Sequence, residues 1–196
     1  MIGFKNTILS FQYILIGLLA SMGITSCADE SKTKKPPIIA PIKLEQAGVV
    51  ADFQFEVREH LVYEFFLRFS FSENDQSERT RVRKIMGGYE YDKSGKALEP
   101  GIPTPIRLVI TRSDQVPEVQ IYMVQMDPIL TSWGAASFDK IIGHCDLPIG
   151  KYRLRLENLR QSSEFASIPT SFIIGMDKFK FTFNPEKSNR SKSCPQ

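Results

Sequence analysis

Apolar and polar residues alternate through most of the chain between residues 48 and 184. The clearest example is residues 61–71, where Leu61 begins a series of six large apolar residues at every second position. This spacing places them on one face of a β-strand, because successive side chains of a strand point to opposite sides. Similar patterns predict about seven strands in all, the others over residues 49–57, 106–110, 119–123, 147–156, 172–174 and 179–183.

A tyrosine follows a turn at the start of one predicted strand. Pro148 and Gly150 favour the turn, and Tyr152 begins the alternation that follows. The arrangement resembles a late strand of immunoglobulin-like and fibronectin-like sandwiches, in which the tyrosine hydroxyl holds the corner. We therefore predict a mainly β protein, an immunoglobulin-like or fibronectin-like β-sandwich over residues 48–184.

Residues 75–88 depart from this alternation and predict one short helix. Asp75 is a suitable N-cap, and Val82, Ile85 and Met86 have the spacing of one helix face. Gly87 is typical of the position at which a helix ends.

The composition is that of an ordinary folded domain. The 196 residues carry a net charge of +3, and 42% of them are hydrophobic and 11% aromatic. A disordered chain has fewer aromatic and branched residues. So small a net charge gives no indication of nucleic-acid binding.

Residues 1–26 have the layout of an export signal: one cation at Lys5, an apolar stretch over residues 8–19 and then small residues. The segment ending at Cys27 resembles a lipobox, the motif of bacterial lipoproteins, through Ile24, Thr25, Ser26 and Cys27. The resemblance implies cleavage before Cys27 and attachment of acyl chains such as palmitate to it. The alternative is an ordinary cleaved signal followed by an incidental cysteine.

The expected lipid anchor at Cys27 also suggests what the segments at the two ends of the mature chain do. Residues 27–47 are expected to form the lipidated cysteine and a flexible tether, since they are polar, contain prolines and lack aromatic residues. Residues 185–196 are expected to form a polar C-terminal tail. Sorting rules for lipoproteins imply that Ala28, directly after Cys27, directs the protein to the outer membrane, facing the periplasm.

Two cysteines remain when Cys27 is set aside. An oxidising compartment favours a disulfide between Cys145 and Cys194, which would stabilise the fold by roughly 3–4 kcal/mol. Two free thiols are the alternative.

No pattern of residues indicates catalysis. The sequence lacks the common nucleophile, metal-binding and phosphate-binding motifs, and it has only His60 and His144 as histidines. His144 and Cys145 are neighbours that a strand would point to opposite faces, so a shared zinc site is not expected. We predict no catalytic residues, no metal and no cofactor.

Candidate partner-binding residues lie in two segments. Trp133, the sole tryptophan, and Ile129 occur in a predicted connection over residues 128–137, where an exposed aromatic side chain can anchor a partner. The predicted helix adds Arg79, Arg81 and Arg83. The alternatives are a loop folded over the end of the sandwich and a solvated helix face.

The mature region also resembles an uncharacterised family of proteobacterial lipoproteins, known as a domain of unknown function. The resemblance is carried by residues 69–75, 82–84, 101–105, 131–134 and 150–153. It implies no activity. Lipoproteins of this size are often immunity proteins, which neutralise a secreted toxin acting in the periplasm.

We therefore expect a lipid-anchored binding protein of the cell envelope whose partner is a toxin or another envelope protein. The alternative is a structural accessory of a secretion or appendage system. The sequence does not indicate an oligomeric state.

Overall fold

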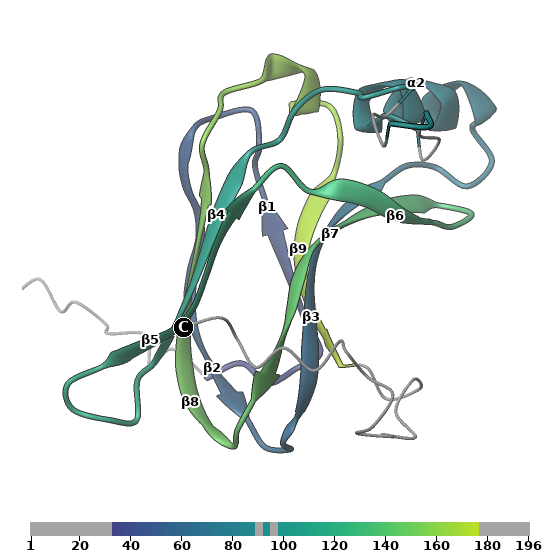
Figure 1. Ribbon diagram of the computed structural model, residues 1–196. Coiled ribbons are helices and arrows are strands. Elements are labelled where there is room, and N and C mark those ends of the chain that lie inside the picture. The colour runs from purple at the N-terminus through teal and green to yellow at the C-terminus, as the bar shows by residue number, and fades with distance from the viewer. Residues whose placement is uncertain (1–32, 89–91, 95–97, 177–196) are drawn as a thin grey trace, which may run out of the picture. The chain divides into compact units, whose positions relative to one another are not determined.

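Nine strands form two antiparallel sheets in the computed structural model, which describes residues 33–88, 92–94 and 98–176 (Figure 1). The five-stranded sheet has, in spatial order, β1 (Ile38–Ile42), β9 (Thr170–Met176), β3 (Leu61–Ser70), β7 (Ser137–Leu147) and β6 (Ile129–Trp133). The four-stranded sheet has β2 (Gly48–Val57), β8 (Gly150–Asn158), β4 (Ile106–Arg112) and β5 (Val119–Met126).

The two sheets pack face to face as a β-sandwich, as the alternation predicted. In β3 the side chains of Phe65, Leu67 and Phe69 are completely buried, which confirms the predicted inner face. Phe65 stacks on Phe172 of the same sheet and on Tyr122 of the facing sheet, with ring centroids 6.4 and 6.0 Å apart. The aromatic residues of both sheets therefore form one continuous core.

Two of the connections that cross from one sheet to the other are each held by a tyrosine. The hydroxyl of Tyr152 donates a hydrogen bond of 2.6 Å to the carbonyl oxygen of Pro148, in the turn between β7 and β8. This contact confirms the predicted tyrosine corner. The hydroxyl of Tyr63 donates in the same way to the carbonyl oxygen of Glu59, at 2.9 Å, in the connection between β2 and β3.

The predicted helix is α2 (Gln76–Met86). The Asp75 side chain accepts a hydrogen bond from the backbone N–H of Glu78, and Gly87 ends the helix with a φ of +87°. Val82 and Met86 are buried against the sandwich. Cap, apolar spacing and stop all lie where the sequence indicated. A single 3-10 turn, η1 (Ser163–Phe165), lies between β8 and β9.

The tether predicted over residues 27–47 is wrong for its second half. Ile38–Ile42 form β1, which pairs with β9, and Leu44 is almost fully buried. Lys34 also forms a bridge to β2. The prolines suggested a linker, but β1 is an edge strand, where a proline is tolerated because one side of its backbone needs no partner.

Strands β6 and β7 were also missed, so three of the nine strands in the described residues, with β1, were not predicted. The predicted connection over residues 128–137 contains β6, and β7 follows it. In β7 the alternation is obscured because Lys140 occupies a buried position and the register shifts near Ile142.

Several predictions lie outside the described residues. These are the lipidation of Cys27, the cysteine partner Cys194, the strand expected over residues 179–183 and the tail over residues 185–196. Within the described ranges, no helix has both the length and the apolar character needed to cross a bilayer.

Candidate functional site

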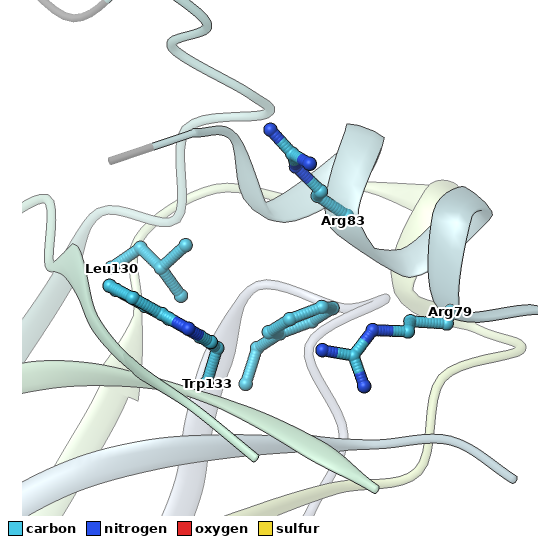
Figure 2. Close-up of a pocket in the computed structure, with 5 residues that line it drawn as sticks. Arg79, Arg83, Leu130 and Trp133 are labelled. Atoms are coloured by element: carbon cyan, nitrogen blue, oxygen red, sulfur yellow. The ribbon is translucent and has the colours of Figure 1, made fainter. Parts of the chain in front are cut away.

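A pocket of about 190 Å³ lies between α2 and the hairpin formed by β6 and β7 (Figure 2). Arg79 and Arg83 reach it from the helix, while Leu130 and Trp133 come from β6 on the opposite side. Phe138, at the start of β7, completes the lining. The pocket thus combines an apolar floor with an aromatic wall and a basic rim.

A β-bulge turns Trp133 into this pocket. Leu130 pairs with Lys140, whereas Ser132 pairs with Asp139, so β6 has one extra residue between these two pairs. Strict alternation would place Trp133 on the face opposite Leu130. The extra residue reverses the alternation, and Trp133 therefore shares the face of Leu130 and lies opposite Phe138.

The helix supplies two arginines because they are four residues apart. Arg79 and Arg83 lie on the same face of α2, one turn from each other. Arg81 lies on another face, where its guanidinium donates a 2.8 Å hydrogen bond to the hydroxyl of Ser167. The spacing of the three arginines thus places Arg79 and Arg83 at the pocket and Arg81 beside Ser167.

Arg79 joins the helix to the hairpin. Its guanidinium donates hydrogen bonds to the carbonyl oxygens of Gly134 and Ala135, at 3.0 and 3.1 Å. The same group lies 5.4 Å from the ring centroid of Phe71 and 5.5 Å from that of Phe138. Arg79 therefore fixes the hairpin turn while keeping its positive charge beside the pocket.

Arg83 and Trp133 form the more accessible part of the site. The Arg83 side chain is 51% exposed and lies 3.5 Å from a carboxylate oxygen of Glu99, itself 63% exposed. Trp133 is 52% exposed, whereas Leu130 and Phe138 are buried. An ion pair so open to water is weak, so the Arg83 guanidinium can exchange Glu99 for another acceptor at little cost.

The predicted binding residues are thus partly brought together. Arg79, Arg83 and Trp133 line one pocket, whereas Arg81 does not. Ile129 pairs with Ile141 on the face of the sheet opposite the pocket, so it does not join Trp133 there, and its role in binding stays a prediction.

Sequence reasoning missed Leu130 and Phe138 as pocket residues. The alternation of apolar and polar residues in the adjoining strands β6 and β7 could have indicated them. It was overlooked because residues 128–137 were predicted to be a connection.

A buried lysine, Lys140, lies two residues after Phe138 and on the same face of β7. Lys140 is 3% exposed, and its ammonium group donates a 3.4 Å hydrogen bond to the hydroxyl of Thr104. Burial lowers the pKa of Lys140, and the charge of Asp127 opposes that change. The lysine therefore belongs to the interior behind the pocket.

The residues near Cys145 do not form a cluster of metal ligands. Cys145 is buried and His144 is exposed, as strand alternation predicted. His60 instead approaches Asp146, with 2.8 Å between Nε2 and a carboxylate oxygen. Within the described residues, no three His, Cys, Asp or Glu side chains are grouped to hold a metal ion.

Comparison with known proteins places the fold in a family. Residues 39–176 match the model of a domain of unknown function, DUF5625. The chain belongs to this family. The match begins within β1 and ends with β9, so the family domain comprises the whole sandwich, α2 and the pocket.

A solved structure shares this fold. The crystal structure of a protein from Sulfurospirillum deleyianum superimposes with a TM-score of 0.61 and 25% sequence identity. The similarity covers 73% of this chain and 98% of that one. No curated protein is detectably similar to the chain.

Proposed function

We propose that this DUF5625 protein is a lipid-anchored binding protein of the bacterial cell envelope that holds a protein partner at the pocket between α2 and β6. Its most specific form is an immunity protein, which neutralises a secreted toxin acting in the periplasm. The observation that carries the proposal is the half-exposed Trp133, which faces two arginines of α2 across a pocket lined by the buried residues Leu130 and Phe138.

The chemistry of this pocket suits a protein surface. Tryptophan and arginine are the residue types that most often dominate the energy of protein–protein interfaces. Leu130 and Phe138 offer apolar contact, and Arg79 and Arg83 offer donors for carbonyl or carboxylate oxygens. A volume of about 190 Å³ matches one large side chain of a partner.

The rigidity of the surroundings supports the same proposal. The hydrogen bonds from Arg79 to Gly134 and Ala135 hold the hairpin against the helix before any partner arrives. A preformed site loses less conformational entropy on binding than a mobile one.

The lipid anchor of the proposal rests on the residues before the described part of the chain. Ile24, Thr25, Ser26 and Cys27 match the lipobox pattern. Two or three acyl chains would hold the protein stably at a membrane surface, since each buried methylene contributes about 0.8 kcal/mol. Cys27→Ser in the full chain should abolish labelling by a fatty-acid analogue. A variant that remains labelled contradicts the anchor.

The binding role is tested by growth competition against a toxin-secreting sibling strain. A strain deleted for this protein should regain survival when it carries the wild-type chain, but not when it carries Trp133→Ala. Ile149→Ala is the matched control, because Ile149 is also an exposed apolar residue but lies in the distant turn between β7 and β8.

Thermal unfolding of both variants controls for loss of the fold. Undiminished survival of the deletion strain overturns the immunity form. A failure to assemble a secretion system or appendage in that strain, without poisoning, would instead assign the structural accessory role.

A further inference from the structure

The two walls of the pocket carry positive charge that their own carboxylates do not balance. Helix α2 has four basic residues and one acidic residue, Glu78. The carboxylate of Glu78 accepts a 2.8 Å hydrogen bond from the backbone N–H of Ser72 and lies 3.9 Å from Arg81, so its charge is used elsewhere. The opposite wall, residues 129–138, contains no charged side chain. The pocket is therefore complementary to a ligand that brings negative charge.

Arg79 pairs with no carboxylate of the described residues. Its hydrogen bonds go to two neutral carbonyl oxygens, and its other contacts are the ring faces of Phe71 and Phe138. Arg79 is also half-buried, so water screens its charge only in part. A carboxylate bound beside the pocket would be attracted by this charge as well as by Arg83.

Arg83 already holds a carboxylate, that of Glu99. The two charged groups are 3.5 Å apart. The backbone of Glu99 is fixed beside the end of α2, because its carbonyl oxygen accepts a 2.7 Å hydrogen bond from the N–H of Gly88. Its carboxylate lies directly over Gly88, where an added Cβ would be 2.7 Å from Oε2. Gly88 thus leaves the space in which Glu99 reaches Arg83.

We propose that the pocket receives an acidic segment of the partner protein, in which a large apolar side chain enters the pocket and a neighbouring carboxylate displaces Glu99 from Arg83. Glu99 is then an internal stand-in for the carboxylate of the partner. This inference rests on the proposed function, because it states the chemistry of the partner that the pocket binds.

The exchange of carboxylates favours the partner. The pair of Arg83 and Glu99 is open to water on both sides, so breaking it has little effect on stability. The carboxylate of the partner would arrive next to an apolar side chain that covers Trp133 and Leu130, which face the two arginines (Figure 2). Water is then excluded from the new ion pair, and a charged hydrogen bond is stronger where water is excluded.

Trp133 is the sole tryptophan of the chain, so its fluorescence reports directly on the pocket. The probe is the peptide Gly-Asp-Phe-Asp-Gly, acetylated and amidated at its ends, titrated into the full chain in phosphatidylcholine nanodiscs at low salt. It should shift the emission of Trp133. The same peptide with both aspartates replaced by asparagine should bind at least about fivefold more weakly.

Two substitutions at the rim should change the affinity for the acidic peptide in opposite directions. Arg83→Gln should raise the dissociation constant at least about fivefold, whereas Glu99→Gln should lower it about threefold by removing the internal competitor. Arg81→Gln is the matched control, since Arg81 belongs to the same helix but contacts Ser167, and it should leave the affinity unchanged. If Glu99 only supported the fold, its replacement would weaken binding.

Equal binding of the two peptides, or no binding of either by fluorescence and calorimetry, overturns the inference. Weaker binding by Glu99→Gln also overturns it. An Arg83-dependent shift with phosphatidylglycerol vesicles, but not with the acidic peptide, would assign the pocket to an anionic lipid surface instead.

Growth competition separates this inference from the proposed function. If Trp133→Ala loses protection while Arg83→Gln and Glu99→Gln protect like the wild type, the binding role stands and the acidic partner is wrong. If the acidic peptide binds as expected but Trp133→Ala protects fully, the chemistry of the pocket stands and the immunity role is wrong.

Discussion

Single side chains fix two of the connections between the two sheets. Tyr63 and Tyr152 are both almost fully buried, and each hydroxyl reaches back to a carbonyl oxygen four residues earlier. Both bonds lie where the chain leaves one sheet and enters the other. The aromatic ring fills the core while the hydroxyl satisfies a backbone acceptor at the turn.

Tyr152→Phe should lower the free energy of unfolding by about 1–2 kcal/mol, because the carbonyl of Pro148 loses its donor while the ring stays packed. Tyr63→Phe should have a similar effect through the carbonyl of Glu59. Urea unfolding measures both. A loss below about 0.3 kcal/mol in either variant would show that water replaces the hydroxyl without penalty.

Lys140→Met should stabilise the protein at neutral pH by about 1 kcal/mol. The lysine is buried, its hydrogen-bond partner Thr104 is neutral, and the attraction of Asp127 offsets only part of the cost of burial, which a methionine of similar length avoids. Thermal or urea unfolding at pH 7 measures the change. A large destabilisation would mean that the hydrogen bond from Lys140 to Thr104 stabilises the protein by more than the burial of the lysine charge destabilises it.

The pH dependence of this gain has a definite sign. Burial lowers the pKa of Lys140 in the folded protein below its ordinary value of 10.5. Between the two pKa values the unfolded chain binds more protons, so this lysine makes wild-type stability rise with pH in that window. The advantage of Lys140→Met should therefore shrink as the pH rises toward 10.5. An advantage that grows with pH would contradict the lowered pKa.

At the scale of elements, α2 is held at both ends, by the β6–β7 hairpin at its beginning and by the connection that precedes β4 at its end. Arg79 binds the hairpin turn near its beginning. At its end, the N–H of Gly88 donates to the oxygen of Glu99, and the N–H of Ile102 donates to the oxygen of Ile85. These contacts fix the helix on the side of the pocket that supplies both arginines.

Gly101→Ala should destabilise the protein by at least about 2 kcal/mol. Gly101 has a φ of +66°, and an added Cβ would lie 2.5 Å from the backbone nitrogen of Gly87. Gly134→Ala is the matched control, because the nearest atoms to its Cβ are at an ordinary 3.7 Å. Equal effects of the two substitutions, measured by urea unfolding, would contradict the close approach of the two backbones.

At the scale of the whole molecule, the pairing of Cys145 with Cys194 remains a prediction. Cys145 is buried on β7 opposite Tyr63, and the other neighbour of Tyr63 is Met176, where the described chain ends. The segment that continues to Cys194 thus starts at the end of β9, two strands away from Cys145. It has enough residues to reach back to Cys145.

Alkylation without reductant, followed by mass measurement, should leave Cys145 and Cys194 of the mature protein unmodified. Reduction should then expose two thiols and lower the free energy of unfolding by roughly 3–4 kcal/mol, because the loop is no longer closed in the unfolded chain. Alkylation of both thiols before reduction would contradict the disulfide.

The agreement between sequence and structure depends on how local each signal is. Helix α2 was predicted with its cap and stop because Asp75, Val82 and Gly87 act within a few residues of one another. Strand β3 was predicted because six alternating apolar side chains leave one arrangement for burial. Strand β1 was missed because its strand character depends on β9, more than a hundred residues away.

The amino-acid sequence by itself determined the β-sandwich, the helix and the tyrosine corner, since periodicity, capping and turn chemistry are written in neighbouring residues. Only the tertiary structure decided the site. The register of β6 against β7 sets the bulge that turns Trp133 toward Phe138, and the packing of α2 brings Arg79 and Arg83 over them. Such pairing joins residues distant in the chain, and no local pattern contains it.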